Sequence, residues 1–425
     1  MPKKPIINRF FLNKKPISGL FFILTMVISP DGLGGEKNTL TLSEALMKTL
    51  KQHPELPAYQ ALVRSARSQI EQAEVGTRPE LSVQVEDALG SGDFQGRKRS
   101  QTTLDISWLL EKKLIERRIA VVEQDERRAI VAQRIRLLDV LATTKALYLE
   151  MLRLQERKAV AMDALKAAQS IREVVRERHR LAAAPQVDLA RANAAVRRQE
   201  LELDRWQSRM DRIRETLAAQ WGAPGRADFG IDGTLRIAAP EVDSPNYGEL
   251  VDTSPYVKTL LVERAAIEKR IGLVKEEARN RIRLTAGVRR HDFENDYSAR
   301  LGFSIPLGSE HRNDSRVAAL RLEEEAYRIK ENAKKLEMKS RIRTLTEQYQ
   351  VAYQQQSALE SEVIPALERA VGDARDAYRK GIYGYQDWWS VQKDWDESRM
   401  ALIEARYEGQ SARAELERIT GSSIR

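Results

Sequence analysis

The 425-residue chain contains no cysteine and only four histidines. Without cysteine it can form no disulfide, no thiolate metal site and no thiol nucleophile, and it has no cysteine to carry a lipid anchor. The histidines, which include no pair at the spacing of metal ligands, are His53, His179, His291 and His311. Acidic residues are plentiful, but they alternate with basic ones as surface pairs do. We therefore predict no catalytic residues, no metal site and no cofactor, and we do not expect an enzyme.

Glycine and proline, the residues that interrupt helices, are missing from three long stretches. Neither occurs between Gly96 and Pro185, between Pro185 and Gly222, or between Gly308 and Pro365. A helix over residues 112–180 would be about 100 Å long at 1.5 Å per residue. Globular helices are usually far shorter. The pattern is typical of long packed helices of the coiled-coil kind.

The chain also lacks a hydrophobic run long enough for a membrane-spanning helix. Its main apolar run, residues 17–28, has 12 residues, whereas a spanning helix needs about 20. Basic residues precede the run, and Ser29, Pro30 and small residues follow it. This is the pattern of a secretory signal peptide, which we place at residues 1–34 with cleavage near Gly34. The sequence thus predicts an exported protein.

The positive net charge does not indicate a nucleic-acid partner. The chain carries a formal charge of +9, and residues 1–34 hold five basic residues against one acid, which leaves +5 (9 − 4) for the remainder. Along the predicted helices the basic residues are interleaved with acids. Such interleaving is typical of solvated helix faces, so we predict no nucleic-acid binding.

One stretch of the sequence occurs twice with an offset of 199 residues. Arg176, Arg180 and Asp188 are echoed by Arg375, Arg379 and Asp387. A seam with spacings of three and four follows each, formed by Leu189, Ala192, Val196, Gln199, Leu203, Trp206, Met210, Ile213 and Leu217, and by Trp388, Val391, Trp395, Ser398, Leu402, Ala405, Gly409, Ala412 and Leu416. We infer two tandem repeats, residues 35–222 and 250–421, joined by a linker over 223–249 and followed by a tail over 422–425.

Each repeat also contains two short segments in which apolar and polar residues alternate. They lie at about residues 80–87 and 102–110 in the first repeat, and 281–289 and 297–306 in the second. Such alternation flanking a polar loop predicts a β-hairpin. In an exported protein it matches the pattern of an outer-membrane barrel, apolar toward lipid and polar toward a lumen. Four strands cannot close a barrel, so copies of the chain would have to pool them.

Taken together, these features resemble the TolC family of outer-membrane efflux channels. The resemblance covers about 380 residues and includes "TLSEALMKTLKQHPEL", "ARSQIEQAEVGTRPELSVQVE", "AYRKGIYGYQDWWSVQ" and "AELERITG". The last helix pair is most similar to the branch that serves heavy-metal exporters of the resistance-nodulation-division class. The resemblance implies a mostly α-helical homotrimer with a 12-stranded transmembrane β-barrel and a helical periplasmic tunnel. It also implies a periplasmic adaptor and an inner-membrane pump as partners, contact with outer-membrane lipid, and a location in the outer membrane.

The resemblance further assigns the two hairpin tips to the periplasmic entrance. The tips lie near Leu181–Pro185 and Gly381–Gly384, and in the family such tips contact the adaptor. Asp188 and Asp387 match aspartates at the entrance, and Tyr378 matches a tyrosine of its closing contacts. The family's locking arginine falls at Tyr383 and a second aspartate at Ser390, so this chain lacks both groups.

Two of these assignments have alternatives that the residues alone leave open. An aspartate ring at a narrow aperture would favour cations and bind a multivalent cation. Asp188 and Asp387 could equally cap the helices that restart after each tip, a position that aspartate favours. Tyr378 could instead fill space between helices.

The main functional hypothesis is a passive exit duct, probably for heavy-metal cations, driven by its inner-membrane pump. Two alternatives remain at this point. One is a channel of the same family for drugs or type I protein secretion. The other is a periplasmic coiled-coil scaffold or adaptor that never enters a membrane; the four alternating segments and the complete duplication argue against it.

Overall fold

The computed structural model describes residues 39–421 except 98, 226–227, 241–246 and 309–310. The first repeat contains β1 (Thr39–Leu40), α1 (Leu42–Gln52), α2 (Leu56–Ala73), β2 (Glu80–Glu86), η1 (Gly92–Phe94), β3 (Gln101–Leu109), α3 (Lys112–Arg180) and α4 (Gln186–Ala219). β4 (Gly230–Ile231) lies in the linker, before α5 (Tyr247–Thr253), α6 (Pro255–Glu277), β5 (Arg283–His291), β6 (Asp296–Ser304), α7 (Asp314–Ala358), η2 (Leu359–Val363), α8 (Ile364–Arg379) and α9 (Tyr385–Thr420). The predicted signal peptide and tail lie outside the described residues.

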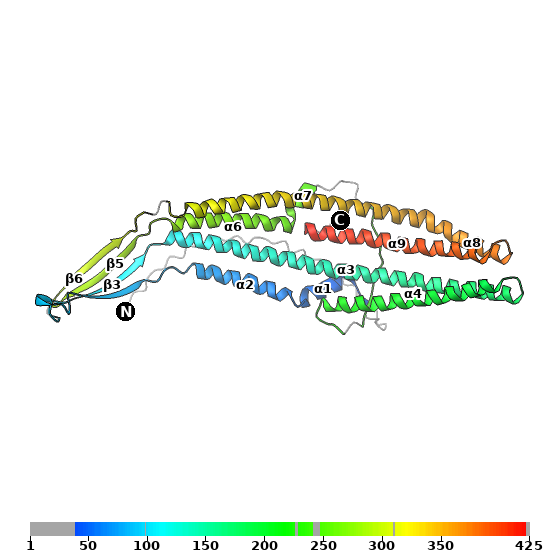
Figure 1. The fold of residues 1–425 in the computed structure, drawn as a ribbon, viewed down its shortest axis with the longest axis horizontal. Helices are drawn as coiled ribbons and strands as arrows, with labels where there is room; N and C mark the ends of the chain where they lie inside the picture. Colours follow the sequence, from blue (N-terminus) through cyan, green and yellow to red (C-terminus); the bar gives the residue numbers. More distant parts are fainter. Residues whose placement is uncertain (1–38, 98, 226–227, 241–246, 309–310, 422–425) are drawn as a thin grey trace, which may run out of the picture. The chain divides into compact units, whose positions relative to one another are not determined.

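The four longer strands form one antiparallel sheet in the order β2-β3-β5-β6 (Figure 1). The register places apolar residues opposite one another across all four strands: Val83 faces Leu104, Leu104 faces Val288, and Val288 faces Ala299. Because side chains alternate between faces along a strand, the sheet acquires one apolar face. That face is exposed in the single chain, as Leu301 at 86% and Phe303 at 75% show.

The opposite face of the sheet is polar and satisfied by cross-strand ion pairs. Arg300 lies 3.1 Å from Asp105, Arg289 lies 2.7 Å from Glu86, and Arg283 lies 3.2 Å from Glu80. The acid and base in each pair come from different strands, so the pairs tie together strands that are not all neighbours. The carboxylate of Asp105 is almost completely buried, and Gly287 stands directly opposite it.

The helices nearest the sheet form a row in the order α2, α3, α6 and α7. α3 packs against α2 on one flank and α6 on the other, and α6 also packs against α7. Ion pairs mark each contact: Arg67 with Glu126, Arg128 with Glu263, and Arg264 with Glu331. Farther from the sheet, α3 pairs with α4 and with α9, and α8 pairs with α9. No helix among the described residues combines the length and the hydrophobicity of a membrane span.

A strap formed by residues 235–238 of the linker crosses α3, α7 and α9. Its backbone is satisfied by side chains from these helices, since Glu156 of α3 accepts from the Leu235 N–H at 2.8 Å. Gln356 of α7 both accepts from the N–H of Ile237 and donates to its carbonyl, each at 3.1 Å. Tyr349 of α7 donates to the carbonyl of Ala238. The strap therefore joins helices of both repeats.

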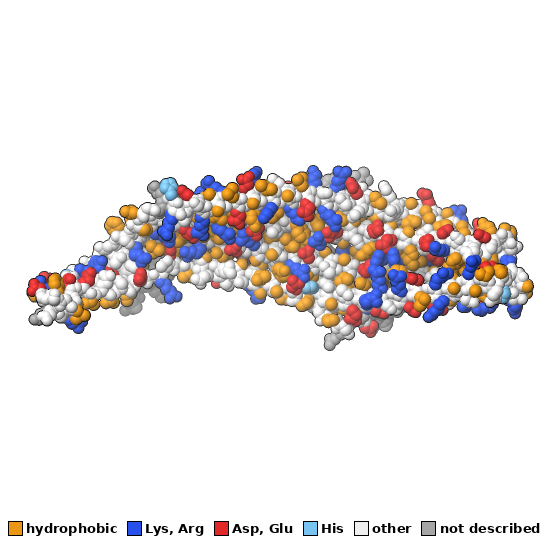
Figure 2. Space-filling view, viewed as in Figure 1, with side chains coloured by type: hydrophobic (Ala, Val, Ile, Leu, Met, Phe, Trp, Pro, Cys, Tyr) orange, Lys and Arg blue, Asp and Glu red, His pale blue; other side chains and the backbone are white. Residues whose placement is uncertain are grey.

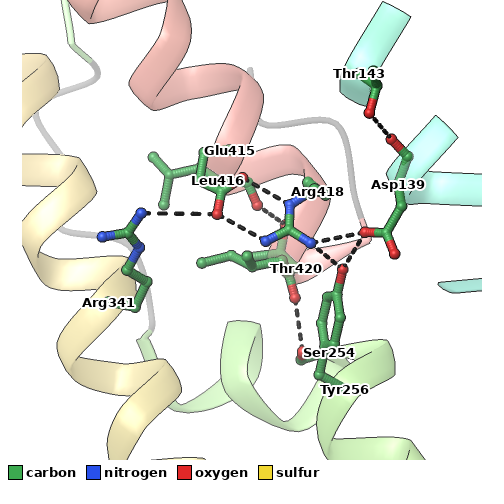
Figure 3. Close-up of polar contacts among 10 residues, drawn as sticks. Asp139, Thr143, Ser254, Tyr256, Arg341, Glu415, Leu416, Arg418 and Thr420 are labelled. Atoms are coloured by element: carbon green, nitrogen blue, oxygen red, sulfur yellow. Dashed lines mark hydrogen bonds and ion pairs between the residues drawn. The ribbon is translucent and has the colours of Figure 1, made fainter. Parts of the chain in front are cut away.

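The carboxyl end of α9 is held by a polar network centred on Arg418 (Figure 3). Its guanidinium donates to Asp139 of α3 at 2.8 Å and to Glu415 at 2.7 Å, and it also contacts the Tyr256 hydroxyl of α6. Tyr256 donates to Asp139 at 2.7 Å. Burial, followed by this bond to a carboxylate, raises the pKa of Tyr256, so the phenol stays protonated and can donate. The network fixes α9 against the first repeat.

The two repeats match with two different offsets. Near the sheet, Tyr148 and Tyr349 correspond at an offset of 201 residues, and both hydroxyls bind backbone carbonyls of segments that cross the helices. At the far ends Val175 and Ala374, both buried, correspond at 199. The π-helical turn Leu359–Val363 lies between these two regions of the second repeat. An extra residue per turn is the mark of such a turn, so the turn occurs where the register between the repeats changes.

Candidate channel entrance at the hairpin tips

The two tips have the same backbone geometry. After α3, Ala182 has a left-handed φ of 55° and the Ala183 N–H donates to Arg178 O at 2.7 Å. After α8, Gly381 has a φ of 79° and the Ile382 N–H donates to Ala377 O at 2.9 Å. A left-handed residue followed by such a bond is a common way to end a helix. Equivalent sequence positions thus make equivalent turns, although the first uses alanine where glycine is favoured.

An aromatic cluster holds the two hairpins together just behind the tips. Tyr378 is only 3% exposed, and its ring centroid lies 5.3 Å from that of Trp388. Ile171 and Val175 of the first hairpin pack into the same cluster. Burial chiefly raises the pKa of Tyr378, and the negative charge of Asp188 adds to the rise. The phenol is therefore uncharged, and within one chain it serves as packing between helices.

Arg178 connects the tips in a way that sequence reasoning missed. Its guanidinium donates to the carbonyl of Tyr378 and, at 3.2 Å, to that of Ala183, and it lies 4.7 Å from the centre of the Tyr378 ring. The position 199 residues later is Ala377, so Arg178 has no echo in the second repeat. Only the three-dimensional arrangement shows that it spans the two hairpins.

The two aspartates of the tips occupy equivalent positions but make different contacts. The N–H of Gly384 donates to Asp387 Oδ2 at 2.9 Å, so Asp387 caps the start of α9. The residue equivalent to Gly384 is Pro185, which has no N–H, and Asp188 cannot make the same bond. Asp188 is half-buried and acts instead through its charge on Tyr378 and Tyr385. The capping alternative thus applies to Asp387 only, and the bond leaves this side chain exposed.

The remaining residues of the expected entrance lie on the surface of the tips. Leu181, Pro185, Gly381, Tyr383, Gly384 and Ser390 are all exposed. In the part of the chain that the structure describes, no group of three or more His, Asp or Glu side chains could hold a metal ion. The tips therefore offer accessible turns with an exposed carboxylate at Asp387, and the protein's own contacts leave these groups free to face a partner or a lumen.

Comparison with known proteins agrees with this architecture. Residues 247–422 match the family described as outer membrane efflux protein. The structure of CusC superposes with a TM-score of 0.73 at 15% identity, covering 92% of this chain and 95% of that one. VceC from Vibrio cholerae gives a TM-score of 0.72 at 16% identity, covering 90% and 97%.

The chain belongs to the outer membrane efflux protein family. Among sequences, this efflux protein is similar to the nickel-cobalt-cadmium resistance protein NccC of Alcaligenes xylosoxydans xylosoxydans, with 27% identity over 306 residues and 68% of each chain covered. The TolC-like fold and the outer-membrane location predicted from the sequence are confirmed.

Proposed function

We propose that three copies of this efflux protein form a passive exit duct for heavy-metal cations. The observation that carries the proposal is the four-stranded sheet, which exposes an apolar face and covers its polar face. Among the described residues, β2 and β6 each have a neighbour on one side only. Open strand edges are not tolerated in lipid. Pairing β6 of one copy with β2 of the next in a trimer would give 12 strands, a size of barrel that leaves an aqueous channel.

The cargo is inferred from the relative and from the chemistry of the wall. NccC is named for resistance to nickel, cobalt and cadmium, and this efflux protein shares its length and pattern. The polar face of the sheet carries Arg283, Arg289 and Arg300, each paired with an acid. Such a wall has little net charge of its own and would neither trap nor repel a cation. Passive conduction needs no catalytic residue, and an inner-membrane pump would supply the energy.

The hairpin tips would receive the periplasmic adaptor and, through it, the inner-membrane pump. The exposed turns at Leu181–Pro185 and Gly381–Gly384 are the surfaces available for this contact. In a trimer, three Asp387 carboxylates and three Asp188 carboxylates would surround the entrance. Tyr383 and Ser390 would add neutral groups there, so the charge at the opening would rest on the two aspartates.

Gene deletion provides the test of the proposed cargo. A strain without the gene should become sensitive to some of the zinc, cobalt, cadmium, nickel, copper and silver salts, and the intact gene should restore growth. Minimal inhibitory concentrations would be measured for each salt, with hydrophobic drugs and a secreted protein as comparisons. A change in drug tolerance or secretion with unchanged metal resistance would overturn the metal assignment and favour the alternative channel functions. A purified protein that is soluble and monomeric without detergent would instead indicate a periplasmic scaffold.

The role of Asp387 at the entrance has its own test. In the variant Asp387→Ala we expect weaker block of single-channel current by divalent cations, because three like charges around a narrow opening bind such ions. Ser390→Ala, one turn further along α9, is the control and should leave the block unchanged. Equal block in Asp387→Ala and the unmodified channel would mean that the carboxylate only caps α9.

A further inference from the structure

A stripe of large apolar side chains lies exposed on α7. Leu322, Ile329 and Leu336 are 71%, 58% and 70% exposed and follow one another at intervals of seven residues. Residues seven apart lie on one side of a helix, as in a coiled-coil seam. In the space-filling view, hydrophobic side chains are interspersed with charged ones along the helices (Figure 2). A regular apolar row of this kind on a long helix indicates a contact with another helix.

The row of helices near the sheet shows where a neighbour is missing. α3 is flanked by α2 and α6, whereas α2 packs only on α3, and the part of α7 that carries the stripe packs only on α5 and α6 among the described elements. Leu62, 59% exposed, lies on α2. The two outer helices of the row, α2 and α7, therefore each have a flank without a partner.

The repeats supply the geometry of the missing contact. Near the sheet, α2 corresponds to α6 at an offset of 201 residues, since the buried residues Leu56, Ala66 and Ala73 match the buried residues Val257, Ile267 and Val274. α3 corresponds to α7 at the same offset, which pairs Tyr148 with Tyr349 and the buried Met151 with the buried Ala352. The contact of α2 with α3 thus repeats as the contact of α6 with α7. The contact of α3 with α6 has no second occurrence within the chain.

We propose that this contact recurs between copies, with α7 of one subunit packed against α2 of the next. The proposal rests on the trimeric channel proposed above and specifies its seam. Within the chain, Arg128 of α3 binds Glu263 of α6 at 2.6 Å. The equivalent positions are Ile329 (329 − 128 = 201) and Leu62 (263 − 62 = 201). Both partners of a charged pair are thus replaced together by apolar residues, and Ile329 contacts Leu62 of the partner subunit.

The neighbouring positions are consistent with a second copy as the occupant. Ile135 of α3, which lines the groove between α3 and α6, corresponds to Leu336 of the exposed stripe. Asp139, which binds Tyr256 of α6 at 2.7 Å, corresponds to Ser340, and Tyr256 corresponds to Glu55. The seam between subunits therefore relies on apolar contact where the seam within the chain relies on charge. An apolar seam resists salt, which screens exposed ion pairs.

The test exchanges the chemistry of the two seams. Leu62→Glu and Ile329→Arg are made singly and together in the full-length protein in detergent, and trimer content is measured by size-exclusion chromatography with light scattering. Each single variant should reduce the trimer-to-monomer ratio about tenfold or more, because it buries an unpaired charge. The double variant should recover to within about threefold of the unmodified protein, because the two charges then pair. Its trimer, unlike the original, should weaken in high salt.

A matched control uses another position of the same stripe. Leu62→Glu combined with Leu322→Arg places the arginine two helical turns away and should not recover the trimer. Helix content from circular dichroism should be unchanged in every variant, since both side chains are exposed in the single chain. Full trimer content in both single variants, or equal recovery by the Leu322→Arg combination, would overturn this seam alone. A wild-type protein that is monomeric in detergent would overturn the trimeric channel itself.

Discussion

Replacing Gly287 with alanine is expected to prevent assembly of the four-stranded sheet. A Cβ atom at this position would overlap the carboxylate of Asp105 and lie 2.5 Å from the carbonyl oxygen of Leu104, a backbone atom of the paired strand. The carboxylate is almost completely buried and bound to Arg300 on the strand beyond. Neither group can move aside without breaking the β3–β5 pairing or leaving a buried charge unpaired, which costs about 3–5 kcal/mol.

Gly302→Ala is the matched control for this prediction. Gly302 lies on the same face, in β6, and its Cβ would meet only the Thr285 Cβ at 3.9 Å, an ordinary contact. We expect the Gly287→Ala protein to be nearly absent from outer-membrane fractions and metal resistance to be lost, with the Gly302→Ala protein close to normal in both. Immunoblots of membrane fractions and growth on metal salts measure the two effects. Normal insertion of Gly287→Ala would show that the buried Asp105 contact does not determine the strand pairing.

Replacing Gly409 with valine is expected to displace the strap of the linker from the helices. In α9, a Cβ at this position would collide with the side chain of Ile237 and lie 3.3 Å from the Cβ of Ala352. The strap cannot retreat without losing both hydrogen bonds between Ile237 and Gln356. Overpacking of this kind typically costs about 1–3 kcal/mol, and two lost buried hydrogen bonds would add about 1–3 kcal/mol each.

The expected result is a markedly lower temperature of unfolding for the helical part, measured by circular dichroism in detergent. Adding Ile237→Ala to Gly409→Val should recover part of the loss, because it removes the side chain that collides. Gly372→Ala is the control: a Cβ there meets no atom within 4 Å, and alanine favours a helix by about 1 kcal/mol over glycine. If Gly409→Val and Gly372→Ala had the same unfolding temperature, the close contact of strap and helix would not matter for stability.

Much of the fold follows from periodicity and from the absence of helix-breaking residues. The helix expected over residues 112–180 is α3 with the same bounds, and the strands begin and end within about two residues of the expected segments. These features are local, since they depend on the spacing of apolar side chains and on where glycine and proline occur. The signal peptide concerns residues that the structure does not describe, and it stays a prediction.

The entrance could be predicted only in part. The echo of Asp188 by Asp387 identified both tips, but it could not show that proline at 185 denies Asp188 the capping bond that Asp387 makes. Arg178 has no echo and was missed, because its partners, the carbonyls of Tyr378 and Ala183, are backbone groups that leave no signal in side-chain patterns. The entrance roles of the tip residues remain predictions.

The sequence by itself determined that this protein is duplicated, exported, largely helical and provided with alternating strands, because these properties arise from neighbours along the chain. The tertiary structure decided the β3–β5 pairing, the burial of Asp105 against Gly287 and the row of helices that ends at α2 and α7. Those depend on groups more than 100 residues apart, whose contact is fixed by packing and by the need to pair buried polar atoms. Neither effect has a period along the chain.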